Sequence, residues 1–245
     1  MIKVLIVDDS ALIRSLLKEM ISAEPDLHVV GAAPDAFVAR DMINKFSPDV
    51  ITLDIEMPRM DGITFLAKLM NARPTPVLMI STLTEKGAEA TLKCLELGAI
   101  DFIAKPKLDV AQGVEAYRQI ILEKIRSASK SKVKKFKTTT RPIEQQSIIG
   151  GTEKIIAIGA STGGTETIKK FLLALPANAP AVVITQHMPP GFTRTFADRL
   201  NDICKVNVAS IDREGDLNKL QMLSHTRGTS IQTLIGSYHL QSFNF

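Results

Sequence analysis

The fold of the first half of the chain is decided by residues 49–62, which have the sequence DVITLDIEMPRMDG. Residues 50–53 are Val, Ile, Thr and Leu, and this apolar run ends at Asp54. A strand that is apolar at successive positions is buried on both faces, which is typical of a parallel sheet between two layers of helices. The stretch therefore predicts a buried strand with a carboxylate at its carboxyl end.

The same alternation of short apolar runs and amphipathic stretches extends over residues 1–127. It predicts an α/β fold, namely an open, doubly wound domain of five parallel strands and five helices. The functional crevice of such a domain lies at the carboxyl ends of the strands. The expected strands are 2–7, 28–33, 49–53, 76–80 and 100–103, and the expected helices are 10–22, 35–45, 63–71, 84–97 and 113–127.

Length and composition indicate about one and a half domains, or two small ones. The chain has 245 residues, of which 45% are hydrophobic and 23% charged, and a typical domain has roughly 100–150 residues. Aromatic residues make up 5% with no Trp, which argues against a site built from stacked rings. Cys94 and Cys204 form no Cys-x-x-Cys pattern, which excludes a disulfide scaffold and a cysteine zinc site.

The net charge of +4 arises in one short segment. Residues 128–150 contain six basic residues and one acidic residue, so the remainder of the chain is close to neutral. This segment predicts a solvated basic linker, with a docking role as the open alternative. The domains lack the basic face of a nucleic-acid-binding protein, and no apolar run approaches the roughly 18–20 residues of a membrane span. We therefore expect a cytoplasmic protein that neither binds nucleic acid nor inserts into a membrane.

The α/β pattern restarts after the linker. A partial Rossmann-like domain is expected at 151–215, with strands at 155–158, 181–185 and 205–209 and helices at 165–175 and 192–200. Residues 216–245 contain only 3 charged residues among 30, but half of the four histidines. We expect this segment to be an atypical polar tail, unrelated to the domain that precedes it.

Polar residues follow four of the five strands expected in the first domain. Asp8 and Asp9 follow the first strand, Asp54 the third, Ser81 the fourth and Lys105 the fifth. Three converging carboxylates require a cation, and oxygen ligands favour Mg²⁺. A hydroxyl and an ammonium group opposite them complete a site for a phosphoryl group, with Asp54 as its acceptor. Helix capping explains any one of these residues alone, but the whole set favours a common site.

A second candidate site follows the strand at 155–158. Residues 159–164, GASTGG, form a Gly-rich turn that would expose Ser161 at the sheet edge, which suits an acyl-transfer nucleophile. One alternative is a phosphate-binding loop, although the Gly-Lys-Ser/Thr ending of a P-loop is missing. The other is a cap of the following helix. His187 follows the next strand, within plausible reach of a hydrogen bond to Ser161.

Residues 1–125 resemble the response-regulator receiver family. The resemblance is carried by the Asp8–Asp9 pair, by TLDIEMPRMDG at 52–62, by Ser81 and by Lys105-Pro106. It implies that a histidine kinase phosphorylates Asp54. It also implies roles for neighbouring residues: Asp8, Asp9, Asp54 and the Glu56 carbonyl as Mg²⁺ ligands, Ser81 and Lys105 as phosphate contacts, and Phe102 as the aromatic switch residue.

The whole arrangement resembles the chemotaxis protein-glutamate methylesterases of response-regulator type, which are also protein-glutamine glutaminases. The added motifs are IGASTGGT at 158–165 and QHMPPGF at 186–192. The resemblance implies phosphorylation-regulated hydrolysis of glutamate γ-methyl esters, and deamidation of glutamines, on the cytoplasmic domains of methyl-accepting chemoreceptors. Ser161 would be the nucleophile and His187 the base of a serine carboxylesterase without a cofactor. Thr162 and Thr165 would lie at the oxyanion turn.

One family motif is missing from the 245 residues. The catalytic acid of the family, an Asp within Gly-Met-Gly-x-Asp-Gly, has no counterpart here. Loss of the acid from a Ser–His–Asp triad lowers the rate on the order of 10⁴-fold. We therefore expect a second domain that is truncated, natively or by a frameshift near residue 216, and little or no esterase activity from this polypeptide. The alternative function is an inert receiver module that still accepts phosphate.

Overall fold

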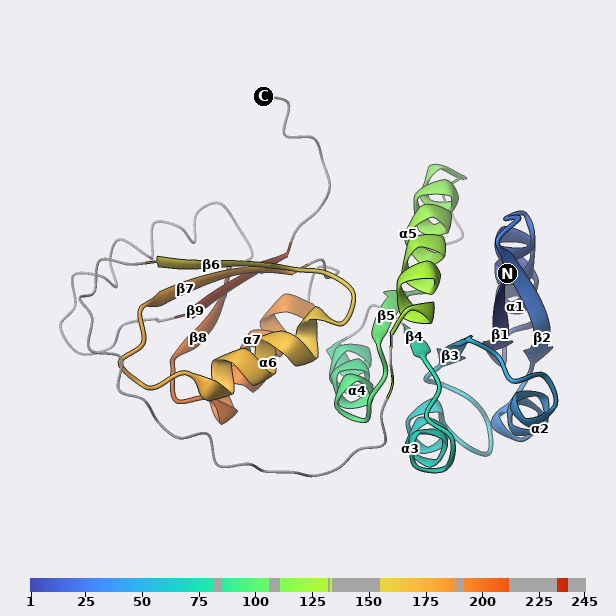
Figure 1. The fold of residues 1–245 in the computed structure, drawn as a ribbon, viewed down its shortest axis with the longest axis horizontal. Helices are drawn as coiled ribbons and strands as arrows, with labels where there is room; N and C mark the ends of the chain where they lie inside the picture. Colours follow the sequence, from blue (N-terminus) through green and yellow to red (C-terminus); the bar gives the residue numbers. More distant parts are fainter. Residues whose placement is uncertain are drawn as a thin grey trace. The chain divides into compact units, whose positions relative to one another are not determined.

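The computed structural model describes residues 1–81, 85–105, 111–131, 133, 155–186, 188, 192–211 and 233–237. The chain divides into two compact units, Met1–Thr138 and Thr139–Phe245, whose elements are labelled in Figure 1. No helix among these residues combines the length and the apolar character needed to cross a bilayer.

The first unit is built on a parallel sheet with the strand order β2-β1-β3-β4-β5. In this sheet Leu53 pairs with Val7 on one side and with Met79 on the other, so the carboxyl ends of neighbouring strands lie level. This confirms the predicted five-stranded, doubly wound sheet. Its strands are β1 (Ile2–Val7), β2 (Leu27–Ala33), β3 (Val50–Asp54), β4 (Val77–Ser81) and β5 (Asp101–Ala104).

Five helices cover the two faces of this sheet, with α1 and α5 on one side and α2, α3 and α4 on the other (Figure 1). Side-chain caps start three of them: Ser10 accepts from the amide of Ile13, and Asp35 and Asp61 cap α2 and α3 in the same way. Such caps satisfy amides that have no partner within the helix. The helices are α1 (Ala11–Ser22), α2 (Ala36–Phe46), α3 (Gly62–Ala72), α4 (Glu85–Glu96) and α5 (Ala111–Ser129).

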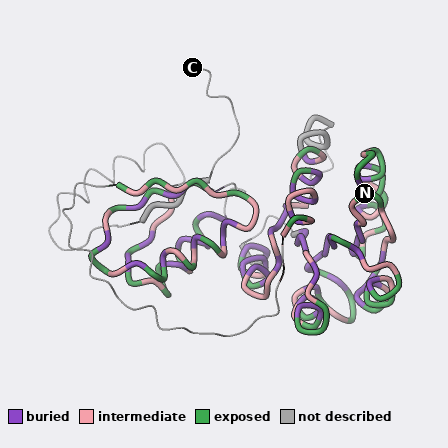
Figure 2. Tube along the Cα trace, in the orientation of Figure 1, coloured by how far each residue is buried: buried purple, intermediate pink, exposed green. Residues whose placement is uncertain are grey.

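The main apolar core lies between the sheet and helices α1 and α5. Val4 and Ile6 of β1 pack there with Leu17 of α1 and Ile121 of α5, and all four are fully buried. The buried strands appear purple in Figure 2. Full burial of one such side chain stabilises the fold by roughly 1.5–3 kcal/mol, so the strands that carry the polar residues are firmly anchored.

Helix α5 continues beyond the residue where the linker was expected to begin. It ends at Ser129, and Ala128 is completely buried in the core. Arg126 near its end forms ion pairs with Glu24 and Asp26 in the loop between α1 and β2. The final turn is therefore part of the first unit. The rest of the expected linker lies outside the described residues, apart from 130, 131 and 133.

The second unit contains a parallel sheet with the strand order β6-β7-β9-β8, which confirms a partial α/β domain. Along β7, Val182, Ile184 and Gln186 are buried while the alternate residues are exposed, and Figure 1 shows α6 and α7 on one side of this sheet. The elements are β6 (Ile155–Ala160), α6 (Gly164–Ala174), β7 (Ala181–Gln186), α7 (Phe192–Ile203), β8 (Val208–Ile211) and β9 (Thr233–Ser237).

Two strands of the second unit differ from the sequence-based expectation. Strand β8 begins at Val208, three residues later than expected, where the Val208 amide donates to Oδ1 of Asn201 at the end of α7. Strand β9 lies within the segment expected to be a polar tail, and it pairs with both β7 and β8. The pairing with two partners places this five-residue strand inside the sheet rather than at its edge.

Candidate functional site

The polar residues predicted at the strand ends of the first unit come together in the structure. One carboxylate oxygen from each of Asp8, Asp9 and Asp54 lies within 4.8 Å of the other two. Lys105, directly after β5, donates from Nζ to Oδ2 of Asp54 at 2.7 Å and lies 3.7 Å from Oδ2 of Asp8. Asp8 and Asp54 are buried, whereas Asp9 is exposed. The cluster is therefore open to solvent on the side of Asp9.

The hydrogen bonding of Asp8 fits a cation-binding role. Its Oδ1 accepts from the amide of Ser10 at 2.8 Å, but its buried Oδ2 has no hydrogen-bond donor among the described residues. A buried carboxylate oxygen without a donor is costly, and a hard cation with oxygen ligands would remove that cost. The three carboxylates therefore form a cluster that could hold a divalent metal ion.

Burial dominates the electrostatics of this cluster. It raises the pKa of Asp54 to about 6, against the lowering effect of the Lys105 hydrogen bond, and the nearby charge of Asp8 raises it further. Burial raises the pKa of Asp8 as well. Burial alone would lower the pKa of Lys105, but its hydrogen bond to Asp54 and the three acidic charges outweigh that effect and raise it. Lys105 is therefore a firmly protonated cation beside Asp54.

The remaining predicted residues of the first site lie nearby along the backbone. The Glu56 amide donates to Oδ1 of Asp54 at 3.3 Å, so the loop after β3 folds back toward the carboxylate. Ser81 is the last residue of β4 and pairs with Ala104 of β5, although its side chain is outside the described set. Phe102 is 2% exposed, and Lys124 donates to its carbonyl at 3.1 Å and to Asp101 at 2.7 Å.

Two residues that support the first site were not predicted. The guanidinium of Arg14 donates to the carbonyls of Asp8 and Asp9 at 2.7 and 2.9 Å, which fixes the loop between β1 and α1. A Cβ added to Gly62 would lie 2.0 Å from the carbonyl oxygen of Asp54. Helix α3 can thus approach β3 closely only because residue 62 has no side chain. Arg14 carries no sequence signal, while Gly62 stands in a quoted motif without an assigned role.

The second predicted site lies at the end of β6. Ser161 follows this strand and is exposed, and Gly163 adopts a left-handed conformation (φ 75°) as helix α6 begins. The carbonyl of Ser161 accepts from the Gly164 amide at 2.7 Å and from Nε2 of Gln186 at 3.0 Å. A turn held at this carbonyl presents the serine side chain to solvent, which suits a nucleophile.

The partners predicted for Ser161 are placed unequally. Thr162 is half-buried in the turn, and Thr165 in the first turn of α6 is buried. His187 lies outside the described residues, but Gln186 before it pairs with Ala160 before Ser161. The two neighbouring parallel strands thus end at the same level. Gln186 is the first residue of the QHMPPGF motif at 186–192, and its contact with the Ser161 turn was not predicted.

Comparison with known proteins places these two sites in context. Residues 4–118 match the family model described as the response regulator receiver domain, and residues 156–231 match the model described as CheB methylesterase. A solved structure, the response regulator domain of Thermotoga maritima CheB, is 45% identical and covers 54% of this chain and 98% of its own, with a TM-score of 0.49. The match to the family model at residues 4–118, together with the five-stranded parallel sheet, identifies the first unit as a response-regulator receiver domain.

Curated relatives extend the match over both units. A protein named protein-glutamate methylesterase/protein-glutamine glutaminase 2 from Pseudomonas aeruginosa is 61% identical over 216 residues, covering 88% of this chain and 62% of the relative. A relative of the same class from Pectobacterium atrosepticum is 56% identical over 209 residues, covering 84% and 60%. The chain is therefore a homologue of proteins named protein-glutamate methylesterase/protein-glutamine glutaminase, and it spans about three-fifths of the length of these relatives.

Proposed function

We propose that the first unit accepts a phosphoryl group on Asp54 from a chemotaxis histidine kinase. The observation that carries the proposal is the environment of Asp54: a buried carboxylate bonded to Lys105 at 2.7 Å beside the oxygens of Asp8 and Asp9. Phosphoryl transfer needs a carboxylate that accepts the phosphoryl group, a nearby cation and oxygen atoms that can bind a metal ion. All three are present in this crevice.

In the proposed transfer, a carboxylate oxygen of Asp54 attacks the phosphorus of a phosphohistidine. The P–N bond breaks, its electron pair stays on the imidazole, and an aspartyl phosphate forms. Lys105 offsets the negative charge of the phosphoryl oxygens, and the Ser81 hydroxyl donates to one of them. Mg²⁺ bound by Asp8, Asp9, Asp54 and the Glu56 carbonyl would supply further positive charge at those oxygens.

For the second unit we propose hydrolysis of glutamate γ-methyl esters, and deamidation of glutamines, on chemoreceptor cytoplasmic domains. Ser161 Oγ attacks the carbonyl carbon while His187 takes the serine proton and returns it to the departing methanol or ammonia. Water, activated by His187, then releases the glutamate and restores the serine. The exposed turn at Ser161, the aligned ends of β6 and β7 and the match at residues 156–231 favour this function over an inert receiver module.

The receiver hypothesis is tested by chemical phosphorylation. The purified chain is incubated with Mg²⁺ and acetyl phosphate, and the modified residue is located by mass spectrometry. We expect one phosphoryl group in the wild type, none in Asp54→Asn, and normal labelling in Asp41→Asn, because Asp41 is an exposed residue of α2. Equal labelling of the Asp54→Asn chain would contradict the proposed acceptor.

The esterase hypothesis needs its own assay, which is methanol release from methylated chemoreceptor preparations. Because a polypeptide of these 245 residues lacks the family's Asp motif, we expect a rate on the order of 10⁴-fold below that of a longer family member. Any residual rate should disappear in Ser161→Ala and persist in Lys170→Ala, which removes an exposed ion pair with Glu166 within helix α6. A Ser161→Ala chain that retains the full residual rate would refute Ser161 as the nucleophile.

A further inference from the structure

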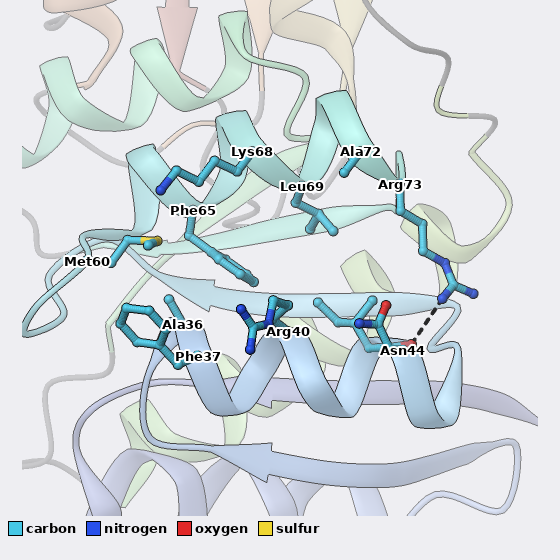
Figure 3. A pocket seen from close by; sticks show the side chains of 11 residues that line it. Ala36, Phe37, Arg40, Asn44, Met60, Phe65, Lys68, Leu69, Ala72 and Arg73 are labelled. Atoms are coloured by element: carbon cyan, nitrogen blue, oxygen red, sulfur yellow. Dashed lines mark hydrogen bonds between the residues drawn. The ribbon is translucent and has the colours of Figure 1, made fainter.

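An apolar groove runs along the surface of the first unit between helices α2 and α3. It has a volume of about 300 Å³. Buried Ile43 of α2 and buried Phe65 and Leu69 of α3 form its floor. Figure 3 shows Phe65 and Leu69 between the two helices, with Phe37 at one lip. Phe37 is 41% exposed, and it extends the apolar surface of the groove to that lip.

The groove stays open because two of its lining residues are alanines and hydrogen bonds link the two helices at one end. Ala36 of α2 and Ala72 of α3 line it and leave the space between the helices unfilled. At one end, Arg73 donates to the carbonyl of Ile43 at 3.3 Å and to Ser47 Oγ at 2.7 Å, which links the end of α3 to α2. A groove that is already open and held by hydrogen bonds binds a ligand with higher affinity than one that must open first, because no free energy is spent on opening.

The other end of the groove is fixed as well. Arg59, in the loop after β3, forms an ion pair with Asp35, and its guanidinium lies 5.2 Å from the centroid of the Phe37 ring. Asp35 in turn accepts from the amides of Phe37 and Val38 at the start of α2. The exposed Phe37 ring is therefore held in place at the lip rather than free to fold into the gap.

The charge around the groove is of one sign. Arg40, Lys68 and Arg73 line it, and none of the described residues that line it carries a carboxylate. Lys68 is exposed, and Arg40 pairs with the neighbouring Asp41 in a contact where both side chains are more than 60% exposed. Exposed pairs of this kind contribute little, so a carboxylate of a partner can replace Asp41. An apolar floor between cationic lips complements a ligand with an apolar face flanked by acidic groups.

We propose that this groove docks an acidic amphipathic helix of a partner protein. Helices α2 and α3 have 11 residues each, so the groove is about 16 Å long, which is enough for about three turns of a bound helix. Its apolar residues at i, i+3 or i+4, and i+7 would enter between Phe37 and Leu69, as in other helix-in-groove interfaces. Its carboxylates would meet Lys68 and Arg40 at the lips.

The test uses designed peptides, because the natural partner is unidentified. The probe is a fluorescein-labelled 14-residue peptide with leucines along one helical face and glutamates at the flanking positions. One control peptide has lysines in place of the glutamates, and a second has serines in place of the leucines. Binding to the full 245-residue chain is measured by fluorescence anisotropy. The binding surface is mapped by amide chemical-shift changes. We expect the glutamate peptide to bind, and the two control peptides to bind at least about tenfold more weakly.

Variants of the chain locate the site. Lys68→Glu should weaken the glutamate peptide about tenfold, and Ala72→Leu should weaken it by filling the groove from an exposed position of α3. Lys18→Glu, the same charge change on an exposed position of α1, should leave binding unchanged. Equal effects of Lys68→Glu and Lys18→Glu, or shift changes outside α2 and α3, would overturn the proposal.

The same chain variants and peptides distinguish two other possible ligands of the groove, a second copy of the chain and a small amphiphile. If the chain forms dimers in sedimentation and Lys68→Glu abolishes them, the groove is an interface between copies and the partner-helix proposal fails. If the glutamate peptide does not bind but decanoate shifts the amide signals of α2 and α3, the groove is a site for a small amphiphile and the proposal fails as well. Saturable binding of the glutamate peptide that is lost in Lys68→Glu and weakens with added salt supports it.

Discussion

The side-chain amide of Gln186 donates to the carbonyl oxygen of Ser161 at 3.0 Å, and so joins the end of one strand to the turn after its neighbour. Gln186 is 2% exposed, and Gly164 packs so closely against it that an added Cβ would lie 2.2 Å from its Oε1. The turn that presents Ser161 is thus held from the adjacent strand. Gln186 acts as a positioning residue for the proposed nucleophile.

Replacement of Gln186 by methionine should loosen this turn. The change keeps the length of the side chain but removes its N–H donor. Of the two donors to the Ser161 carbonyl among the described residues, the Gly164 amide then remains. We expect the free energy of unfolding of the second unit to fall by about 1 kcal/mol, as measured by urea denaturation followed by circular dichroism. The matched control is Thr167→Ala, which removes an exposed hydroxyl bond to the Gly163 carbonyl and should change stability by less than about 0.5 kcal/mol. Equal losses of unfolding free energy in the two variants would show that Gln186 does not hold the Ser161 turn in place.

Glycine at position 62 should be required for the geometry of the proposed phosphoryl-acceptor site. In Gly62→Ala the new Cβ would meet the Asp54 carbonyl at 2.0 Å and Cα of Ile55 at 2.9 Å, and both are backbone atoms that cannot rotate away. We expect a loss of about 1–3 kcal/mol in the free energy of unfolding and slower labelling of Asp54 by acetyl phosphate.

The control for this prediction is Gly31→Ala in β2. There the closest atom is the thioether sulfur of Met42 at 2.8 Å, on a flexible side chain that can move. Gly31→Ala should therefore cost less stability than Gly62→Ala and leave Asp54 labelling unchanged. The prediction fails if the two variants unfold at the same urea concentration.

The clustering of Asp8, Asp54 and Lys105 could be predicted from the sequence because these residues follow buried strands. Asp8, Asp54 and Lys105 each end a continuous apolar run, and parallel strands bring such ends to one edge of the sheet. Arg14 and Gln186 could not be predicted, since a side chain that bonds a backbone carbonyl leaves no pattern in the sequence. Strand β9 was missed for a related reason: Thr233–Ser237 is short and is defined only by pairing with strands distant in sequence.

The groove between α2 and α3 also lies beyond sequence reasoning. Periodicity indicates which side of each helix is apolar, and Phe65 and Leu69 of α3 follow that pattern as buried residues. Whether the gap beside them is filled depends on the sizes of side chains that meet only in three dimensions, here Ala36 and Ala72. Packing of this kind is set by the whole fold and not by either segment alone.

Removal of the buried charge at Asp54 should stabilise the metal-free chain. A carboxyl whose pKa is raised in the folded state destabilises the fold at pH values above that pKa, because the ionised form is disfavoured by burial. With the pKa of Asp54 raised to about 6, Asp54→Asn should be more stable than the wild type at pH 8, by roughly 1–3 kcal/mol. The difference should shrink as the pH falls through 6, where the wild-type carboxyl takes up a proton.

Thermal and urea unfolding in EDTA between pH 5 and pH 8 measures this difference. Asp41→Asn is the control, since its exposed carboxylate is paired only with Arg40 and its removal should change stability little at any of these pH values. Addition of Mg²⁺ should reverse the order of stability of wild type and Asp54→Asn, because only the wild type retains all three carboxylates. An Asp54→Asn chain that is less stable than the wild type at pH 8 without metal would contradict the assigned electrostatics.

The ion pairs of Arg126 should stabilise the first unit at neutral pH and not in acid. Arg126 donates to Asp26 at 2.8 Å and to Glu24 at 2.7 Å, and these hydrogen bonds lower the pKa of both carboxyls below their ordinary values of 3.8 and 4.5. A lowered folded-state pKa gives stability that is present above the ordinary pKa and is lost as the pH falls through the folded-state pKa. Arg126→Gln should therefore unfold at a lower urea concentration than the wild type at pH 7, and the two should converge as the pH falls through the lowered folded-state pKa values of Glu24 and Asp26. Arg40→Gln, which breaks only the exposed pair with Asp41, should match the wild type throughout. If the gap between Arg126→Gln and the wild type stays constant down to pH 2, the contribution of Arg126 is packing of its aliphatic stem on the α1–β2 loop rather than charge.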